Sequence, residues 1–412
     1  MSRELVRAGD PGPRHSPSGA IDSDYDVIVV GGRVAGASTA MLLARRGHRV
    51  LLVERAAMPS DTVSTHALLR TGVLQLTRWG ILDRITGAGT PPIRDITLGF
   101  DDERIPFRVR PECGVDTLYA PRRYLLDAEL LEAARDSGVE VREETSMKDL
   151  LRDEDGRVVG IRAGRGSSAR DTTARYVIGA DGHRSRVAEL AGSVVRRSHP
   201  PINAIHYSYY EGIDATGFWF QFTPGVNVGL VPTNDGRCLV FAGRPPDLRQ
   251  SFATDPDAEF MHLLEQGAED LAELVGAGRR VERFYGTSGL PGFIRQAWGP
   301  GWALVGDAGY TKDPISAHGI SDALRDAELC ARAVDRALQD ALEETAAFDW
   351  YETLRDSLST RLFEQSEALA RYEWSPAEAS ARMRVISDEV RAECQTLMSL
   401  PSWDLTGSLV GT

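Results

Sequence analysis

The stretch that most constrains this chain is residues 26–55. It holds, in order, an apolar run that ends at Val30, the turn Gly31-Gly32-Arg33-Val34-Ala35-Gly36, an apolar helical pattern up to Gly47, and a second apolar run that ends at Glu54. A strand, a glycine turn, a helix and a second strand with a terminal acid, within about 30 residues, are typical of a dinucleotide-binding βαβ unit. We therefore expect an α/β fold that holds a nucleotide at the ends of these strands.

Each position in this unit has a physical role. Gly31 is expected to make the tight turn, and Gly36 lets the helix pack closely on the sheet. The helix N-terminus offers free N–H groups and the positive end of its dipole to a pyrophosphate. Glu54 is placed to accept hydrogen bonds from ribose hydroxyls. Arg33 replaces the second glycine of the motif, so its side chain is expected either to point away or to lie over the phosphates. A βαβ unit without a ligand is the plainer alternative.

Composition bounds the function class. The chain has 412 residues, 42% hydrophobic and 26% charged, as is ordinary for a soluble globular enzyme. Its net charge of −13 argues against a nucleic-acid partner. The four cysteines, Cys113, Cys238, Cys330 and Cys394, are far apart, so we expect no disulfide framework, no metal site and a cytoplasmic location. No apolar run has the length of a membrane span, and residues 1–22 are expected to form a disordered tail.

Hydrophobic periodicity divides the rest of the chain into alternating blocks. Helical patterns cover residues 63–85, 122–137, 258–276, 319–342 and 349–397. Strand patterns cover residues 90–110, 139–141, 158–161, 176–182, 202–243 and 303–307. Helices and strands interleave along the chain, which favours an α/β organisation.

Two further motifs stand at predicted strand ends. Asp181-Gly182 follows one buried strand, and Gly306-Asp307 follows another. Ligands of open α/β sheets bind at the carboxyl ends of strands, where an aspartate can hold a sugar hydroxyl. Each dipeptide alone is more often a plain turn. The order glycine turn, Asp-Gly, Gly-Asp favours a nucleotide site.

With these motifs the chain resembles the FAD-dependent monooxygenases of the para-hydroxybenzoate hydroxylase type, also called group A, over residues 25–345. The resemblance implies that Arg123 lies near the flavin phosphates, that Met147 lies at the adenine and that His66 takes the place of a pyrophosphate-facing arginine. The full set of implied FAD contacts is Gly31, Arg33, Val34, Ala35, Gly36, Glu54, Arg55, His66, Arg123, Met147, Asp181, Gly182, Gly306, Asp307, Pro314, His318 and Gly319.

The resemblance also implies an architecture. A Rossmann-like FAD-binding domain, formed by residues 23–89, 117–195 and 283–345, is interleaved with a mixed-sheet substrate domain. The substrate domain takes residues 90–116 and 196–282, and residues 346–412 form a C-terminal helical region.

The implied activity is insertion of one oxygen atom from O2 into a small or medium organic substrate through a flavin C4a-hydroperoxide, with NAD(P)H as reductant. There are two alternatives: an FAD-dependent reductase similar to geranylgeranyl reductases, and a flavin-binding protein without catalysis. Ala188 replaces a common arginine of the Asp-Gly motif, and Ser316 replaces a glycine below the flavin. Catalytic candidates by location are His66 and His318. For Lys312 and Asp313 a structural role is favoured.

The segment 202–243 is expected to roof the substrate pocket. Alternate residues of a strand share a face, so Tyr207 pairs with Tyr209, and Trp219 pairs with Gln221. We expect these four to line a pocket for a largely apolar, aromatic or polyene ligand. The opposite set of Phe218, Phe220 and Phe222 is expected to pack against the core. The expected partners are this substrate and O2, and a homodimer is left open.

Overall fold

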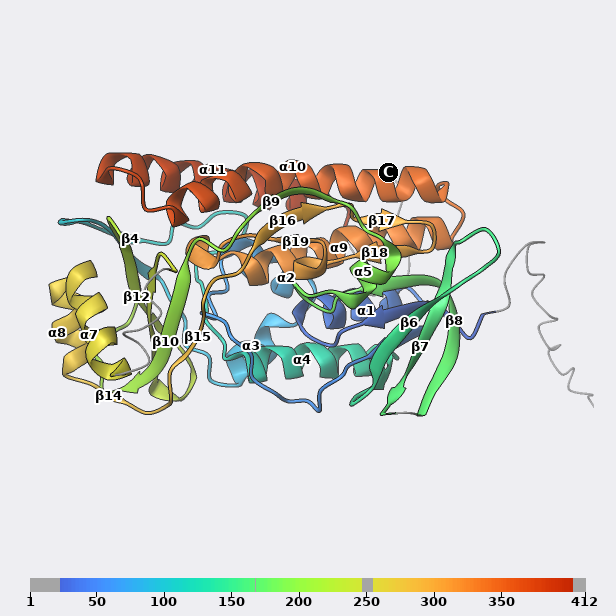
Figure 1. Ribbon diagram of the computed structural model, residues 1–412, viewed down its shortest axis with the longest axis horizontal. Helices are drawn as coiled ribbons and strands as arrows, with labels where there is room; N and C mark the ends of the chain where they lie inside the picture. Colours follow the sequence, from blue (N-terminus) through green and yellow to red (C-terminus); the bar gives the residue numbers. More distant parts are fainter. Residues whose placement is uncertain (1–22, 167, 247–254, 403–412) are drawn as a thin grey trace, which may run out of the picture.

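The structure is a computed structural model, which describes residues 23–166, 168–246 and 255–402. It has two large sheets, one at each end of an elongated molecule, with helices between and along them (Figure 1). The expected disordered tail, residues 1–22, lies outside the described residues, as does the end of the C-terminal region after residue 402.

The first sheet carries the glycine turn. Its central strands are parallel to one another, in the order β18-β8-β1-β2-β5, and β17 closes one edge. The strands are β1 (Tyr25–Val30), β2 (Val50–Val53), β5 (Glu140–Arg142), β6 (Ser146–Arg152), β7 (Val158–Arg165), β8 (Ser168–Gly179), β17 (Trp298–Gly299) and β18 (Trp302–Leu304). β1, β2 and β18 are buried on both faces, which explains their unbroken apolar runs.

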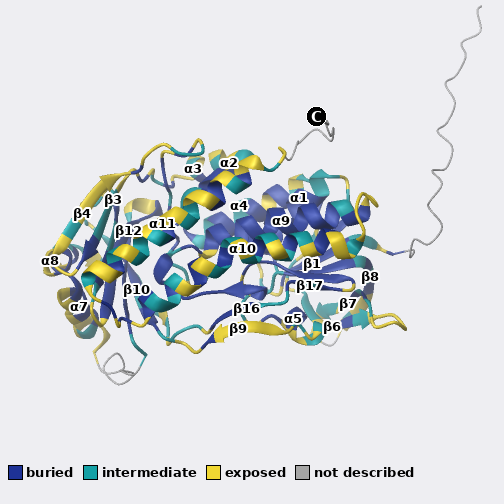
Figure 2. Ribbon diagram, turned by 90° about the horizontal axis from the view of Figure 1, so that it is seen from above, coloured by how far each residue is buried: buried dark blue, intermediate teal, exposed yellow. Residues whose placement is uncertain are grey.

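Helices cover one face of this sheet. α1 (Val34–Arg45) packs between α4 (Arg123–Asp136) and α9 (Gly319–Leu338), and α1 and α9 are almost entirely buried (Figure 2). The other face is covered by α5 (Arg186–Ala191) and the β6–β7 hairpin. The sheet is therefore a middle layer, and the carboxyl ends of its parallel strands point toward the second sheet.

The second sheet has the order β14-β10-β13-β12-β11-β3-β4, with β15 also on β10. Its strands are β3 (Asp95–Phe100), β4 (Glu103–Arg108), β10 (Ala204–Glu211), β11 (Phe218–Thr223), β12 (Val226–Pro232), β13 (Cys238–Arg244), β14 (Arg279–Arg280) and β15 (Tyr285–Thr287). α7 (Pro256–Gly267) and α8 (Glu269–Gly276) pack against its outer face. A small third sheet joins β9 (Val195–His199), β16 (Gly292–Arg295) and β19 (Tyr310–Thr311).

The last two helices connect both ends of the molecule. α10 (Glu344–Ala370) packs on α9, and α11 (Pro376–Ser399) reaches β3 and β11 of the second sheet (Figure 1). α11 begins at a capping box, in which Ser375 and Glu378 satisfy each other's backbone N–H groups. The expected C-terminal helical region is therefore a strap over both sheets.

Two helix predictions were wrong in their bounds. The pattern at 63–85 forms a loop followed by α2 (Arg70–Arg78) and α3 (Leu82–Gly87). His66 has a left-handed φ of 64°, which a helix excludes, and Gly80 at φ 69° ends α2. The pattern at 258–276 is two helices, because Ala268 is extended between α7 and α8. Apolar spacing continued across both breaks, so periodicity alone missed them.

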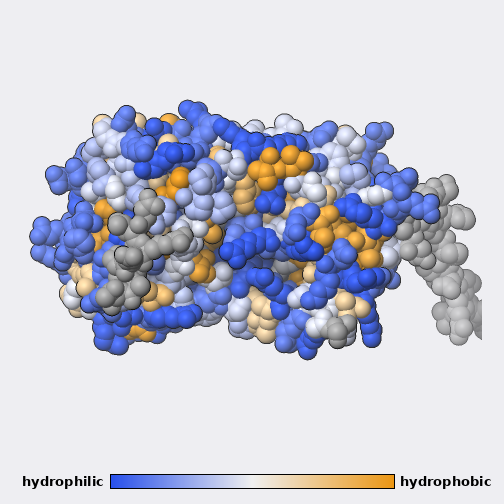
Figure 3. All heavy atoms as spheres, viewed as in Figure 1, coloured by the Kyte–Doolittle hydropathy of each residue, from blue (hydrophilic) through white to orange (hydrophobic). Residues whose placement is uncertain are grey.

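Among the described residues, no helix combines the length and apolarity needed to cross a membrane. On the face drawn in Figure 3, apolar residues form separate small areas between hydrophilic ones.

Candidate functional site

The glycine turn after β1 leaves no room for side chains at two positions. Gly31 has φ 110°, and a Cβ there would lie 2.4 Å from the Ala180 carbonyl oxygen. A Cβ on Gly36 would lie 1.8 Å from the Gly31 carbonyl oxygen. The start of α1 therefore approaches the ends of β1 and β8 as closely as backbone allows.

Glu54 closes the turn from the end of β2. Its side chain is buried and accepts hydrogen bonds from the backbone N–H groups of Gly32 at 2.7 Å and Ala56 at 2.8 Å. These two bonds fix a carboxylate beside the N-terminus of α1. A carboxylate accepts more than two hydrogen bonds, so capacity for ribose hydroxyls remains.

Arg33 is held by protein partners. Its Nη1 lies 2.8 Å from Oδ2 of Asp127 on α4, and its Nη2 donates to Ser60 Oγ at 3.1 Å. Arg123 shares the same buried carboxylate through its Nη2 at 3.0 Å. Protein groups thus hold the Arg33 side chain, and Asp127 joins it to Arg123.

Asp181 is used to start a helix. Its carboxylate accepts from Ser185 Oγ at 2.6 Å and from the backbone N–H groups of Arg186 at 2.7 Å and Val187 at 3.2 Å, all at the beginning of α5. Gly182, at φ 83°, faces open space, with no atom within 4 Å of a Cβ. The Asp-Gly motif thus combines a helix cap with accessible backbone.

Asp307 differs from its surroundings. It is exposed, whereas Gly301–Gly306 and Ala308–Asp313 are buried. Protein atoms nevertheless crowd its carboxyl group, and this partial loss of water raises the pKa of Asp307. The charges of His183 and Lys312 act in the opposite direction. Within the described residues, no protein group donates a hydrogen bond to this carboxylate. An accessible but crowded carboxyl at a strand end is suited to a ligand hydroxyl.

The N-terminus of α9 lies beyond this aspartate. His318 is the N-cap residue and supplies no side-chain cap, and the accessible Gly319 faces open space. The His318 Nδ1–H donates to the Ser316 carbonyl oxygen, and burial lowers the pKa of His318 to about 3. The helix therefore begins at an accessible glycine beside an uncharged imidazole, and no side chain caps its first N–H groups.

Ser316 also has a structural explanation. Its Oγ accepts a hydrogen bond from Ser366 Oγ of α10 at 2.9 Å, and both residues are buried. The left-handed residue of this turn is Ala317, at φ 57°. The serine in place of the expected glycine therefore ties the turn to the C-terminal strap.

His66 lies in an aromatic and basic group between the sheets. Its Nε2 is hydrogen-bonded to the Tyr209 hydroxyl, the two rings are stacked at 5.8 Å, and the Arg122 guanidinium lies 3.7 Å from the centre of the Tyr209 ring. Burial, with the charges of Arg122 and Arg123, holds the pKa of His66 well below its usual range. Its buried Nδ1 has no partner among the described residues.

The prediction that four pocket residues share one face of the second sheet was wrong. Cross-strand pairs place Tyr207 on the row of Phe241, Gly229 and Phe220. Trp219 lies on the row of Leu230, Val240 and Ser208, on the opposite face, which packs against α7 and α8. A shift of one residue in register exchanges the faces of a strand.

Gln221 shares the outward face with Trp219. Its side chain lies over Gly99, where a Cβ would be 1.6 Å from Oε1, and its Nε2 donates to the Asp101 carbonyl oxygen at 2.8 Å. The inner face instead carries Phe218, Phe220 and Phe222, with Tyr207 and Tyr209. The phenylalanine set packs in the core as expected, and its face is the one on the side of the strand ends.

Sequence reasoning named Asp313 but missed the buried polar group to which it belongs. Asp313 accepts hydrogen bonds from Asn203 Nδ2 at 3.1 Å and from the Ile315 N–H at 3.0 Å, and Tyr372 donates to Asn203 Oδ1 at 2.9 Å. Burial raises the pKa of Asp313 to about 7, and its Oδ2 has no partner among the described residues. These residues come from three distant segments, so no spacing signals them.

The remaining cofactor candidates lie on four segments around the first sheet. Val34 and Ala35 begin α1, Arg55 follows Glu54, and Pro314 opens the turn before His318. Met147 lies on β6 and not on β5, the strand that directly follows α4. It packs against the apolar cluster between the first sheet and α5.

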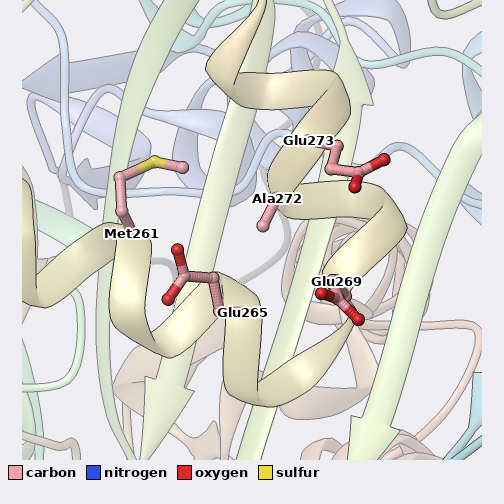
Figure 4. A pocket seen from close by; sticks show the side chains of 5 residues that line it. All are labelled: Met261, Glu265, Glu269, Ala272 and Glu273. Atoms are coloured by element: carbon pink, nitrogen blue, oxygen red, sulfur yellow. The ribbon is translucent and has the colours of Figure 1, made fainter.

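A depression between α7 and α8 is lined by Met261, Glu265, Glu269, Ala272 and Glu273 (Figure 4). It lies on the outer side of the second sheet, away from the strand ends, and its carboxylates would repel a phosphate. No group of three potential ligands for a metal ion occurs in the described part of the chain.

These features fit a flavin adenine dinucleotide. The glycine turn and the N-terminus of α1 suit a pyrophosphate, Glu54 suits a ribose, and the accessible Asp307 suits a ribityl chain. The start of α9, with no side-chain cap and with the accessible Gly319, suits an electron-rich ring edge. Accessible backbone or carboxyl groups recur just after β1, β8 and β18, although the last residues of these strands are buried.

Comparison with known proteins agrees with this geometry. Residues 24–366 match the FAD binding domain family, so the chain belongs to that family and is an FAD-dependent oxidoreductase. It is 30% identical over 338 residues to digeranylgeranylglycerophospholipid reductase 2 of Methanopyrus kandleri, covering 78% of each chain. It is 27% identical over 403 residues to 6-methylpretetramide 4-monooxygenase of Streptomyces rimosus, covering 94% of this chain and 91% of that protein.

Solved structures share the fold. PqsL of Pseudomonas aeruginosa has a TM-score of 0.74 at 23% identity and covers 91% of this chain and 100% of its own. The fold of the para-hydroxybenzoate hydroxylase type is thereby confirmed, with its FAD-binding part, its mixed sheet and its C-terminal helices.

Proposed function

We propose that this protein is an FAD-dependent monooxygenase that inserts one oxygen atom of O2 into a largely apolar organic molecule, with NAD(P)H as reductant. The observation that carries the proposal is the N-terminus of α9, where uncapped N–H groups adjoin the neutral His318. Such an end stabilises negative charge on a reduced flavin ring, the form that reacts with oxygen. The flavin, when bound, supplies the redox and oxygen chemistry.

The chain's own residues bind and orient. We assign the pyrophosphate to the turn at Gly31–Gly36 with Arg123 beside it, and the ribityl chain to Asp307. The aromatic inner face, with Phe220 and Tyr207, would cover the reacting ring and exclude water. We assign the substrate to this face, with the Tyr209 hydroxyl and His66 as its polar end.

The C-terminal strap, formed by α10 and α11, supports the hypothesis of a monooxygenase. Residues 1–375 amount to about 91% of the 412-residue chain, so an alignment that spans 94% must extend into α11. The 6-methylpretetramide monooxygenase is one relative whose alignment includes residues of α11. The alignment with the Methanopyrus reductase spans 78% of the chain and does not require α11. A polycyclic aromatic substrate is accordingly our first choice.

A reductase is the second candidate, and Asp313 favours it. Reduction of an alkene needs a proton as well as a hydride. Asp313 precedes the turn that leads to His318, and because burial raises its pKa to about 7 it carries a proton near neutral pH. The 30% identity to a lipid reductase supports the same candidate.

One set of measurements separates the candidates. The purified protein should release FAD and not FMN on denaturation, without a covalent link to the chain. Reduced enzyme with polycyclic phenols and with polyprenyl lipids is then followed by oxygen uptake and product mass. Uptake of O2 with a product heavier by one oxygen atom supports the monooxygenase. A product heavier by two hydrogens, formed without oxygen uptake, supports the reductase. If neither NADH nor NADPH reduces the flavin, NAD(P)H is not the reductant.

A further inference from the structure

Two of the four cysteines face each other across the fold. Cys394 is fully buried on α11, and Cys113 is half-buried in the loop between β4 and α4. The Cys113 thiol lies near enough to Cys394 to act on its pKa, and both residues pack against the main apolar core. The pair therefore joins the last helix to a loop that precedes it by most of the chain.

Polar contacts hold the loop on either side of Cys113, one to α11 and one to α2. Arg391, one turn before Cys394 on α11, pairs with Glu112, the residue before Cys113, at 2.9 Å from Nε to Oε1. Arg70 of α2 donates to the Val115 carbonyl oxygen at 2.7 Å. The thiols are thus brought together by the surrounding structure.

Cys113 occupies an unusual backbone position. The Val115 N–H donates to the Glu112 carbonyl oxygen at 2.9 Å, and the two central residues, Cys113 and Gly114, have φ of 51° and 75°. Positive φ at both central positions defines a type I′ turn, which Asn, Asp and Gly fill at the lowest cost. The turn itself therefore gives no reason for a cysteine, whereas the facing thiol does.

We propose that Cys113 and Cys394 form an intramolecular disulfide when a peroxide oxidises the protein, which fastens α11 to the 109–117 loop. The sulfur of the accessible Cys113 attacks a peroxide oxygen, becoming a sulfenic acid as the O–O bond breaks and water leaves. The Cys394 sulfur then attacks the Cys113 sulfur. The S–S bond forms, the S–O bond breaks, and the leaving oxygen takes up the Cys394 proton as water.

The sum is two thiols and one hydrogen peroxide giving one disulfide and two waters, so the peroxide is the two-electron oxidant. Burial raises the pKa of Cys394, which keeps it a thiol and makes the second step the slow one. A flavoenzyme whose reduced cofactor meets oxygen without substrate releases hydrogen peroxide, so the protein proposed above would make its own oxidant. The proposal also holds for peroxide from elsewhere.

The link would stiffen the connection to the site. Glu393, beside Cys394, lies 3.5 Å from Arg325 of α9, and Arg325 donates to Asp322, the partner of Lys312. All four charged residues are buried. A disulfide at Cys394 would hold this ion cluster, and with it the turn before His318, against the C-terminal strap.

The test is a non-reducing peptide map of the full chain. Reduced protein is treated with hydrogen peroxide, alkylated with N-ethylmaleimide and digested with trypsin. We expect residues 109–122 and 392–412 as one species, two hydrogens lighter than their sum and absent after dithiothreitol. Alkylation of both thiols, or sulfinic acid on Cys113 without the linked species, would overturn the proposal.

Matched variants keep the test independent of folding. Cys113→Asn places a residue that suits the turn and should fold well while giving no link, and Cys238→Ser, at a buried cysteine elsewhere, should keep it. Peroxide should raise the Tm of the wild type and of Cys238→Ser by several degrees, because the cross-link restricts the unfolded chain. An equal rise in Cys113→Asn would show another cause and refute the link.

Discussion

Arg33 and Asp127 form an ion pair of 2.8 Å between the glycine turn and α4, at the position where the family motif has a glycine. The Asp127 side chain is fully buried, and Arg123 is its second partner. Where the motif has a flexible glycine, this chain therefore has an arginine whose side chain links the glycine turn to α4.

We expect Arg33→Gly to destabilise the protein more than it weakens FAD binding. The change restores the motif but leaves buried Asp127 with one cation, at a cost of about 1–3 kcal/mol. Thermal denaturation and FAD titration of the apoprotein measure the two effects. The double variant Arg33→Gly/Asp127→Asn should regain part of the Tm. A larger loss of FAD affinity than of stability would mean that Arg33 contacts the phosphates.

Asp307→Ala should weaken FAD binding more than Asp181→Ala does. The Asp307 carboxylate is accessible, whereas Asp181 is engaged in starting α5. Loss of a hydrogen bond to a sugar hydroxyl costs about 0.5–1.5 kcal/mol, or about two- to tenfold in Kd. Asp181→Ala should instead lower the Tm. Titration of both apoproteins with FAD decides the matter, and equal or reversed losses in affinity would contradict these assignments.

Asp313→Asn should remove a pH dependence of stability. Burial raises the folded pKa of Asp313 to about 7, from an ordinary value of 3.8. The folded state thus binds the proton more tightly, so the free energy of unfolding falls as the pH rises from 4 to 7 and is level above. A shift of about three units corresponds to about 4 kcal/mol at most.

The asparagine keeps the acceptor for Asn203 and Ile315 and carries no charge. Denaturant unfolding at pH 5 and pH 8 should show a smaller difference for Asp313→Asn than for the wild type. The same difference in both proteins would show that Asp313 titrates normally.

Phe220→Ala should disturb ligand binding, and Trp219→Ala should disturb packing. Phe220 lies on the inner face of the second sheet, and Trp219 on the outer face against α7 and α8. We expect Trp219→Ala to lower the free energy of unfolding by about 1–3 kcal/mol, since its side chain is only partly buried. Flavin absorbance changes on addition of an aromatic ligand should survive Trp219→Ala and weaken in Phe220→Ala. The reverse result would place the pocket on the other face.

The spacing of apolar residues along the chain predicted helices and strands correctly where at least one face of the segment is buried. The helix over residues 122–137 appears as α4 (Arg123–Asp136), because its leucines form one buried stripe. The hairpin at 90–110 appears as β3 and β4 around Asp101-Asp102. The loop that carries His66 was missed, because the left-handed φ of His66 and the pairing of Leu68 with Tyr119 are not visible in the apolar spacing.

The sequence alone determined the cofactor class. The glycines at positions 31 and 36, the acid at 54 and the Gly-Asp at 306–307 are local signals, since each depends on backbone geometry within a few residues. The tertiary structure alone decided what depends on distant contacts: the partner of Arg33, the inward face of the aromatic sheet, the buried Asp313 and the meeting of Cys113 with Cys394. These follow from how separate segments pack, and strand register and helix docking leave no trace in local spacing.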